Sequence, residues 1–219
     1  MIEELGRKFE LDELLDLANT KELFNSLSEL LGLQIKIYTN KGKELLSCGK
    51  EPPFCSLINS SDEGETLCQT VKDKLLSQII SGSSALQIQS ACGMKYTVFP
   101  LQYQFEQLGR AIVGPYQDQG IEPARLEMIA LRQKLDPKKF DLAYHQLPEL
   151  TSDQLKKAVR FLSRLFDAVI FITAKRLITS VMHLELIMQN REKIFAEMEK
   201  EAKGSAQDKK EIDKYKNMF

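Results

Sequence analysis

The sequence has few of the residues that build metal and catalytic sites. It contains two histidines and four cysteines, and no two cysteines form a Cys-x-x-Cys pair. A zinc ribbon or a thioredoxin-like redox site is therefore unsupported. The Walker A phosphate loop, the dinucleotide-binding glycine fingerprint and the Gly-x-Ser-x-Gly nucleophile motif are also absent. We therefore expect a protein that is not an enzyme and that uses no cofactor.

The sequence also lacks an excess of charge and a long apolar run. Thirty basic residues balance thirty-one acidic ones, which leaves a net charge of −1. This balance predicts neither nucleic acid nor an anionic membrane as a partner. No apolar run approaches the roughly 18 residues needed to cross a bilayer, and the acidic start Met1-Ile2-Glu3-Glu4 is unlike a signal peptide. We therefore expect a cytoplasmic location and no membrane segment.

Neither histidine is in a convincing catalytic setting. His145 precedes Pro148 in an expected loop, where exposure to solvent is the default. His183 falls in an expected helix, loosely like the phospho-accepting helix of a two-component kinase. No room for an ATP-binding domain follows it. Catalysis by histidine also needs an oriented partner, so we interpret His183 as a helix-flank residue.

The first half of the chain changes from a helical to a strand pattern. Residues 1–31 are acidic and have apolar side chains at spacings of three and four, with Asn19 or Thr20 as the expected N-cap and Gly32 as the stop signal. Alternation then predicts strands at 33–38 and 44–48, and Glu51-Pro52-Pro53 predicts an extended loop. A helix from Ser61 or Asp62 to about residue 82 follows.

Three further strands are expected, at 85–90, 95–103 and 109–116, with a hairpin turn at 104–107 between the last two. The order helix, two strands, helix, three strands favours an antiparallel sheet with helices on one side. The fold class that we predict is α+β, with a PAS-like antiparallel sheet flanked by helices and followed by a long C-terminal helix.

The last third of the chain is helical. Helices are expected at 122–135 and 137–144, and a long one begins at Thr151, where Gln154 completes a capping box. Beyond about Lys175 its apolar positions predict a dimeric coiled coil, because an unshared apolar stripe favours aggregation. We predict four regions: a helical segment at 1–31, a sensory domain at 32–150, a signalling helix at 151–203 and a charged tail at 204–219.

Three of the cysteines form a distinctive pattern. Cys55, Cys68 and Cys92 are separated by 12 and 23 residues, and they fall on an expected loop, helix and strand junction. They could converge at one end of the sheet, where they would be weak candidates for metal ligands. Free cysteines are often simply small buried residues, and spacing alone favours that interpretation.

Several spaced motifs resemble the PocR-type sensory domain, a PAS-like bacterial ligand-binding module. The similarity covers roughly residues 17–173. The matching motifs are Leu30-Leu31-Gly32-Leu33, Pro53-Phe54-Cys55-Ser56-Leu57-Ile58, Glu63-Gly64-Glu65-Thr66-Leu67-Cys68, Ala91-Cys92-Gly93-Met94, Val98-Phe99-Pro100-Leu101, Leu108-Gly109-Arg110-Ala111, Val113-Gly114-Pro115 and Leu147-Pro148-Glu149-Leu150-Thr151.

The resemblance implies a sensor that binds a small organic ligand, such as a short diol or alcohol, and passes the signal to an output domain. It implies a pocket lined by six residues, which are Phe54, Cys55, Cys68, Cys92, Tyr96 and Phe99. Two departures weaken any metal site, because Gln69-Thr70-Val71 and Gly93 stand where the family often has a further cysteine and a histidine. No DNA-binding helix-turn-helix or complete kinase follows the sensor-like region.

Three functional hypotheses remain open. The first is a ligand sensor that acts as a homodimer through its C-terminal helix, with a protein partner or a missing output domain downstream. The second is a scaffold or dimerisation module in which the sensor fold has lost its ligand. The third is a cysteine-based redox or metal sensor, which would retain metal or a disulfide after purification.

Overall fold

The computed structural model describes residues 8–60, 72–77, 85–90, 93–117 and 121–201, with side chains described as far as residue 198. The helices are α1 (Leu11–Leu14), α2 (Leu17–Leu31), α3 (Pro53–Asn59), α5 (Pro123–Arg132), α6 (Pro137–His145) and α7 (Ser152–Glu201), and residues 72–77 are also helical. The strands are β1 (Ile35–Thr39), β2 (Glu44–Cys48), β3 (Leu86–Gln89), β4 (Lys95–Tyr103) and β5 (Glu106–Tyr116).

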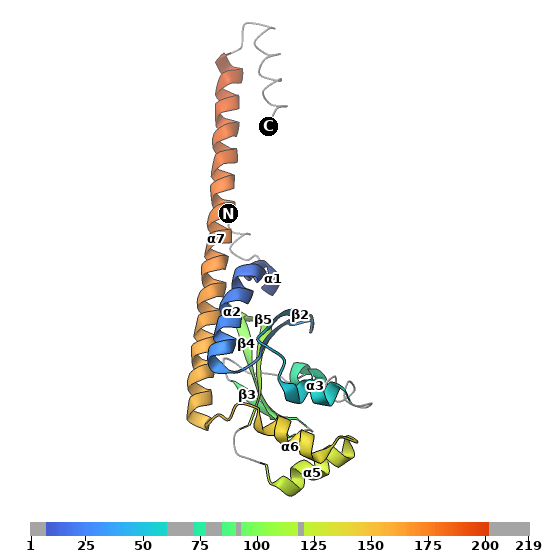
Figure 1. Ribbon diagram of the computed structural model, residues 1–219. Coiled ribbons are helices and arrows are strands. Elements are labelled where there is room, and N and C mark those ends of the chain that lie inside the picture. The colour runs from blue at the N-terminus through green and yellow to red at the C-terminus, as the bar shows by residue number, and fades with distance from the viewer. Residues whose placement is uncertain (1–7, 61–71, 78–84, 91–92, 118–120, 202–219) are drawn as a thin grey trace. The chain divides into compact units, whose positions relative to one another are not determined.

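The chain divides into two compact units. One comprises residues 6–173, and the other comprises residues 1–5 and 174–219. The first unit contains the sheet and every described helix up to the first part of α7 (Figure 1). In the second unit the structure describes the remainder of α7.

Helix α2 is delimited by two strong local signals. The Asp16 side chain accepts a hydrogen bond from the backbone N–H of Asn19 at 3.3 Å, so Asp16 is the N-cap. At the other end Gly32 has a φ of 67° and its N–H donates to the carbonyl of Ser28. Gly32 ends the helix as predicted, whereas the expected N-cap at Asn19 or Thr20 is wrong. Asp16 caps the helix about one turn before the expected position, so Thr20 lies inside the helix and is buried.

The two consecutive prolines begin a helix. Pro52 is extended (φ −62°, ψ 143°) and serves as the N-cap of α3, while Pro53 is its first residue. The loop predicted at residues 51–53 therefore ends at Pro52, one residue earlier than expected. Proline is well suited to the first helical position, because its φ is already helical and the N–H that it lacks would have no intrahelical acceptor.

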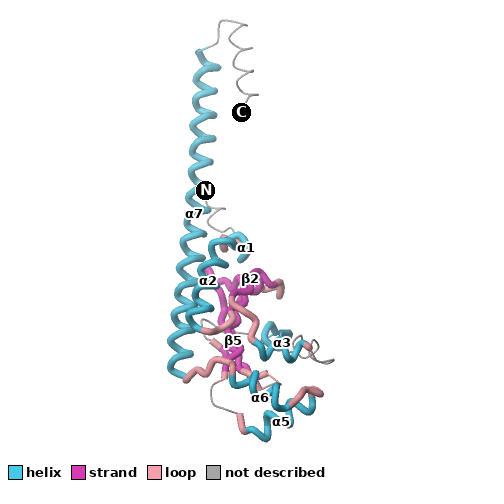
Figure 2. The backbone as a smooth tube through the Cα atoms, in the orientation of Figure 1, coloured by secondary structure: helices cyan, strands magenta, loops and turns pink. Residues whose placement is uncertain are grey.

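The five strands form one antiparallel sheet in the order β2-β1-β5-β4-β3. Figure 2 shows these strands at the centre of the first unit, with helices around them. The fold class is therefore α+β, as predicted. Successive side chains of a strand point to opposite faces, so Val98 and Phe99 of β4 face opposite sides of the sheet.

Helices cover both faces of the sheet. On one face, the ring of Phe166 from α7 stacks on Phe24 of α2 with centroids 4.0 Å apart, and lies 6.0 Å from Phe99. On the other face, Leu75 from helical residues 72–77 packs in a buried cluster with Val98. The prediction that the helices lie on one side is therefore wrong. Element order alone does not say to which face a connecting helix returns.

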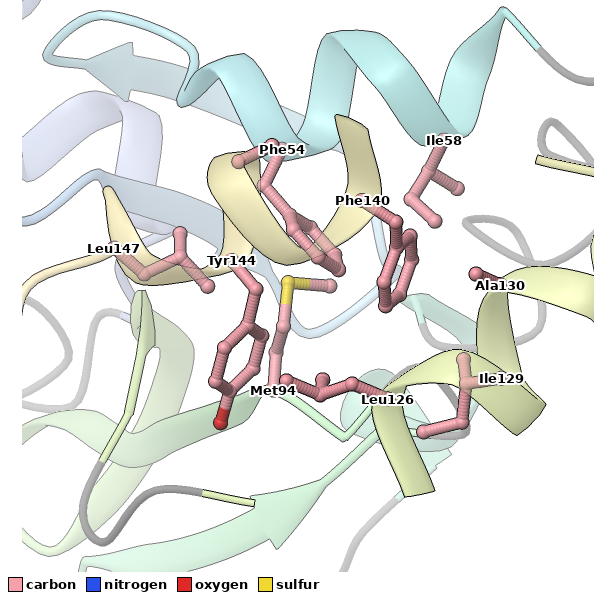
Figure 3. Close-up of a cluster of buried hydrophobic side chains, with 10 residues drawn as sticks. Phe54, Ile58, Met94, Leu126, Ile129, Ala130, Phe140, Tyr144 and Leu147 are labelled. Atoms are coloured by element: carbon pink, nitrogen blue, oxygen red, sulfur yellow. The ribbon is translucent and has the colours of Figure 1, made fainter. Parts of the chain in front are cut away.

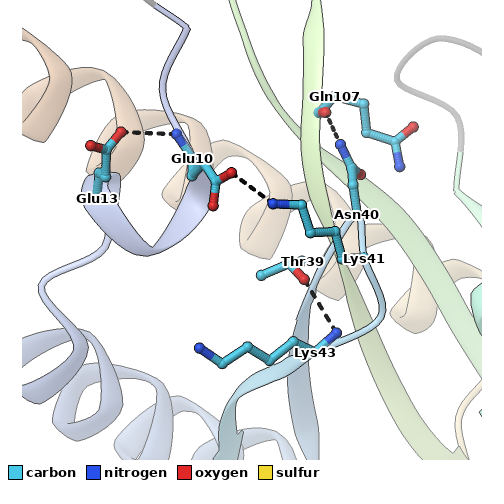
Figure 4. Close-up of polar contacts among 7 residues, drawn as sticks. All are labelled: Glu10, Glu13, Thr39, Asn40, Lys41, Lys43 and Gln107. Carbon is cyan, nitrogen blue, oxygen red and sulfur yellow. Dashed lines mark hydrogen bonds and ion pairs between the residues drawn. The ribbon is translucent and has the colours of Figure 1, made fainter.

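Helix α1 is held against the turn between β1 and β2 (Figure 4). Glu10 and Glu13 form a capping box at its start, and Lys41 Nζ lies 2.8 Å from Glu10 Oε1. The Asn40 side-chain amide donates to the carbonyl of Gln107 on β5. The Lys41–Glu10 pair is exposed, so it positions α1 more than it stabilises the fold.

Helix α7 begins at the predicted capping box. The backbone N–H of Thr151 donates to Gln154 Oε1 at 3.0 Å, and the backbone N–H of Gln154 donates to Thr151 Oγ1 at 3.3 Å. Within the described part of the chain, α7 and the other helices are too short or too polar to cross a membrane.

Candidate functional site

One face of the sheet gathers aromatic, aliphatic and polar side chains beneath helical residues 72–77. We call it the Tyr96 face. Cross-strand partners of an antiparallel sheet share a face, and the register pairs Tyr38 with Arg110, Ile112 with Val98, and Tyr96 with Ile88. The side chains of this face therefore come from four neighbouring strands.

Tyr96 lies where two buried clusters meet. One cluster, formed by Tyr38, Leu75, Ile88, Val98 and Ile112, sits between the sheet and helical residues 72–77. The other joins α3, α5 and α6 and contains Phe54, Ile58, Met94, Leu126, Ile129, Ala130, Phe140, Ala143, Tyr144 and Leu147. Tyr96 is partly buried and packs against both clusters. A change at the Tyr96 side chain would therefore alter the packing of both clusters.

Phe54 is embedded in the second cluster. Its ring centroid lies 4.8 Å from that of Phe140 and 5.9 Å from that of Tyr144. Figure 3 shows the Phe54 and Phe140 rings close together, with the Met94 side chain beside them. Offset and tilted aromatic pairs of this kind fix the relative position of helices. The Phe54 side chain thus anchors α3 on α6 next to Tyr96.

Tyr38 brings a polar group to the Tyr96 face. Its hydroxyl donates to Glu44 Oε2 at 2.6 Å, and Lys72 Nζ lies 5.4 Å from the centre of its ring. Burial raises the pKa of Tyr38 well above its ordinary value, and the hydrogen bond to Glu44 and the charge of Glu44 raise it further. Tyr38 is therefore a neutral donor at physiological pH, and Glu44 is engaged by it.

Arg110 ties the helix above this face to the sheet. Its guanidinium donates to the carbonyl of Leu75 at 3.4 Å and to the carbonyl of Leu76. Burial lowers the pKa of Arg110 from its ordinary value, yet a guanidinium stays charged at any physiological pH. Arg110 therefore fastens helical residues 72–77 onto β5.

Ser90 has a buried hydroxyl with no hydrogen-bond partner among the described residues. The residue is 8% exposed and directly follows β3. Its backbone N–H donates to the carbonyl of Met94 at 2.8 Å, and the N–H of Gly93 donates back to the carbonyl of Ser90. Alternation along β3 places Ser90 on the same face as Ile88, that is, the Tyr96 face. Leaving a buried hydroxyl unpaired costs about 1–3 kcal/mol.

The structure brings together some of the residues expected to line the pocket. Phe54 and Tyr96 meet in one cluster, and the half-buried Cys55 lies on α3. Phe99 is fully buried on the opposite face of β4, against Phe166, so it is separated from Tyr96 by the sheet. Cys68 and Cys92 lie outside the described residues, and their proposed convergence with Cys55 stays a prediction.

The histidines occupy exposed positions. His145 is the last residue of α6, where its Nε2 lies 3.4 Å from Asp141 Oδ1 one turn earlier. His183 is exposed on α7. Among the described residues, no group of three or more histidine, cysteine, aspartate or glutamate side chains could hold a metal ion. This finding does not bear on a site that would include Cys68 or Cys92.

The sequence interpretation missed Ser90, Tyr38 and Arg110. Ser90 directly precedes the Ala91-Cys92-Gly93-Met94 motif, which was the one available signal for it. Arg110 belongs to the Leu108-Gly109-Arg110-Ala111 motif. Neither its contact nor that of Tyr38 has a local signal, because their partners Leu75 and Glu44 become neighbours only through the return of the helix and strand pairing.

The architecture defines an α+β domain with a PAS-like sheet, one face of which carries a buried hydroxyl. Over residues 13–174 the sequence matches the family model described as the sensory domain found in PocR, and the chain belongs to this family. The expected span of 17–173 is thus confirmed to within a few residues. No curated protein and no solved structure matches the chain. Membership implies a sensing or signalling role and suggests a function other than catalysis.

Proposed function

We propose that the protein binds a small, weakly polar organic molecule on the Tyr96 face and relays the bound state through its C-terminal helix. The single observation that carries the proposal is the Ser90 hydroxyl, which is buried on this face without a partner among the described residues. A ligand hydroxyl would supply the missing hydrogen bond. We place the protein in the cytoplasm, where such small metabolites are available.

The surroundings of Ser90 favour a neutral ligand. Met94, Tyr96 and the cluster around Phe54 are predominantly apolar. Two charged groups of the Tyr96 face are engaged within the protein, because Glu44 accepts from Tyr38 and Arg110 donates to the carbonyl of Leu75. Apolar walls with a few polar groups suit a compact alcohol or a short diol.

The proposed relay of the bound state depends on the side chains on the two faces of β4. Val98 packs on the Tyr96 face and the adjacent Phe99 packs against Phe166 of α7. A ligand that shifts β4 would therefore alter the packing of α7. The continuation of α7 beyond about Lys175 carries exposed apolar side chains, including Met182 and Leu186, which supports a homodimeric coiled coil reaching a partner or an output domain.

A thermal-shift screen of short alcohols, diols and aldehydes against the full chain tests the proposal. A ligand at a concentration one hundred times its Kd stabilises the folded state by about 2.7 kcal/mol. The Ser90→Ala variant should bind the same compound roughly tenfold more weakly, since one hydrogen bond contributes about 0.5–1.5 kcal/mol. The matched control is Ser77→Ala, because the Ser77 hydroxyl is exposed and bonds to the carbonyl of Lys74.

Two results would count against ligand sensing. The absence of stabilisation by any compound, together with a dimeric mass, would favour the scaffold hypothesis. Equal weakening by Ser77→Ala and Ser90→Ala would show that the Ser90 hydroxyl does not contact the ligand.

A further inference from the structure

Helix α7 has one apolar face that its own domain covers. Its buried side chains within residues 152–173 are Leu155, Val159, Leu162, Phe166 and Ile170. This inner stripe, with spacings of four, three, four and four residues, includes the ring that stacks on Phe24 and approaches Phe99. The sheet domain therefore already occupies this side of the helix.

A second apolar stripe runs along the same turns of α7. It consists of Ala158, Phe161, Leu165, Ala168 and Ile172, and we call it the outer seam. At 3.6 residues per turn its centre lies roughly 120° around the helix from the inner stripe. Phe161 is 54% exposed and Ile172 is 56% exposed, although both belong to the unit that contains the sheet.

The spacing of the outer seam is that of a coiled coil. Its intervals alternate between three and four residues, and the sequence keeps this alternation through Lys175, Thr179, Met182 and Leu186. A strict seven-residue repeat matches a partner helix that supercoils around α7. The inner stripe drifts away from that repeat, as expected for a straight helix lying on a sheet.

We propose that the outer seam is where a second copy of this chain docks, in parallel, so that the dimer contact begins inside the sensory domain. This inference deepens the proposed function, which places the coiled coil only beyond about Lys175. Each turn of α7 in the sensory domain would then carry the sheet contact on one side and the partner helix on the other.

The flanking charges favour self-pairing. In a parallel pair the position before every second seam residue, such as Leu165 or Ile172, faces the position five residues on in the partner. Arg164 would then face Val169, and Phe171, which is exposed, would face Arg176. No like charges oppose each other at these positions, and an arginine beside an aromatic ring is favourable.

The size of the seam is sufficient for a dimer. From Ala158 to Leu186 it is roughly 42 Å long at 1.5 Å per residue. With Phe161 and four large aliphatic or Met side chains covered in each copy, the seam would bury on the order of 1,000 Å² in total, which approaches a standard protein interface. Lys175 is the least favourable position of the seam, because the Lys175 side chains of the two copies would face each other with like charge.

Sedimentation equilibrium of the full chain tests the inference. Ile172→Asp should raise the dimer Kd at least about 100-fold, because it places two charges in the seam, and Lys175→Leu should lower it by about tenfold or more. Leu184→Asp is the matched control, since Leu184 is equally exposed but lies away from the seam repeat. The thermal unfolding of the sheet domain should be preserved in all three.

Each outcome has a distinct meaning. If Leu184→Asp dissociates the dimer and Ile172→Asp does not, the contact lies only in the distal part of α7. That result overturns the inference and leaves the proposed function intact. An unchanged Kd in Lys175→Leu also overturns it. A strictly monomeric wild-type chain would remove the dimer altogether, whereas ligand binding is decided separately by the Ser90→Ala measurement.

Discussion

The close approach of α2 to the strand end at Gly49 depends on one side chain being absent. Gly49 has a φ of 91°, and a Cβ there would collide with the Ser28 hydroxyl and lie 3.0 Å from the Ser28 Cβ. That hydroxyl donates to the carbonyl of Leu33 and is buried. The Gly49 N–H in turn donates to Asn25 Oδ1 at 3.0 Å. One residue thus combines a left-handed backbone with a tight helix contact.

Replacing Gly49 by alanine should therefore destabilise the protein by about 2–4 kcal/mol. The left-handed backbone accounts for about 1–2 kcal/mol, and the displacement of Ser28 adds the loss of a buried hydrogen bond. Urea unfolding followed by circular dichroism measures the change. Gly42→Ala is the control, because Gly42 has a φ of 78° but a Cβ there meets only Leu76 at an ordinary 3.6 Å. Equal losses in both variants would refute the role given to Ser28.

Alkaline pH should destabilise the folded state. Burial raises the pKa of Tyr38, Tyr144 and Cys48, and Glu44 adds to the effect at Tyr38. In the unfolded chain these groups lose their protons near about pH 8.5 for cysteine and 10 for tyrosine. The folded state retains its protons to higher pH, so their contribution is complete below those values and is lost as pH rises through the folded pKa values.

The measurement is the free energy of unfolding from about pH 8 to 11, the range that contains these unfolded pKa values. Tyr38→Phe should make the free energy of unfolding fall less steeply with pH, because it removes the hydroxyl with the most strongly raised pKa and keeps the ring. Tyr103→Phe is the comparison, since the Tyr103 ring also packs on a neighbour, 5.7 Å from Phe9. A slope in Tyr38→Phe identical to the wild-type slope would show that this hydroxyl does not titrate as proposed.

At the scale of elements, the start of α7 is set by three mutual hydrogen bonds between Thr151 and Gln154. Thr151→Ala should lower the free energy of unfolding by about 1 kcal/mol, because the first turn loses its cap. Ser180→Ala, at an exposed position within the same helix, should change it by less than about 0.5 kcal/mol. Thermal denaturation of the two variants would distinguish them. A neutral Thr151→Ala would mean that packing of Leu155 alone fixes the helix start.

At the scale of the whole molecule, the two large buried clusters lie entirely before Thr173. A chain shortened to residues 1–176 should therefore still unfold cooperatively, with a free energy of unfolding within about 1 kcal/mol of the full chain when both are compared as monomers. Its dimer should be weaker, since Thr179, Met182 and Leu186 of the outer seam are removed. Loss of the cooperative transition would show that the sheet domain needs the distal part of α7.

The sequence by itself determined the periodic and local features. Alternation located β1 and β2, Gly32 ended α2, and Thr151 with Gln154 began α7, because these signals act between residues close together in the chain. The spaced motifs were sufficient to predict the PocR sensory domain family. Local signals misplaced the starts of two helices. Pro53 was expected in a loop but begins α3, and the N-cap of α2 was expected at Asn19 or Thr20 but is Asp16.

Only the tertiary structure decided which residues meet. It placed Phe99 against Phe166 of α7 and Val98 against Leu75 of helical residues 72–77. It also left the Ser90 hydroxyl buried without a partner among the described residues, and it showed which stripe of α7 the sheet domain covers. These facts depend on the side of the sheet to which each helix returns. Long-range packing sets that choice, and no local pattern in the chain encodes it.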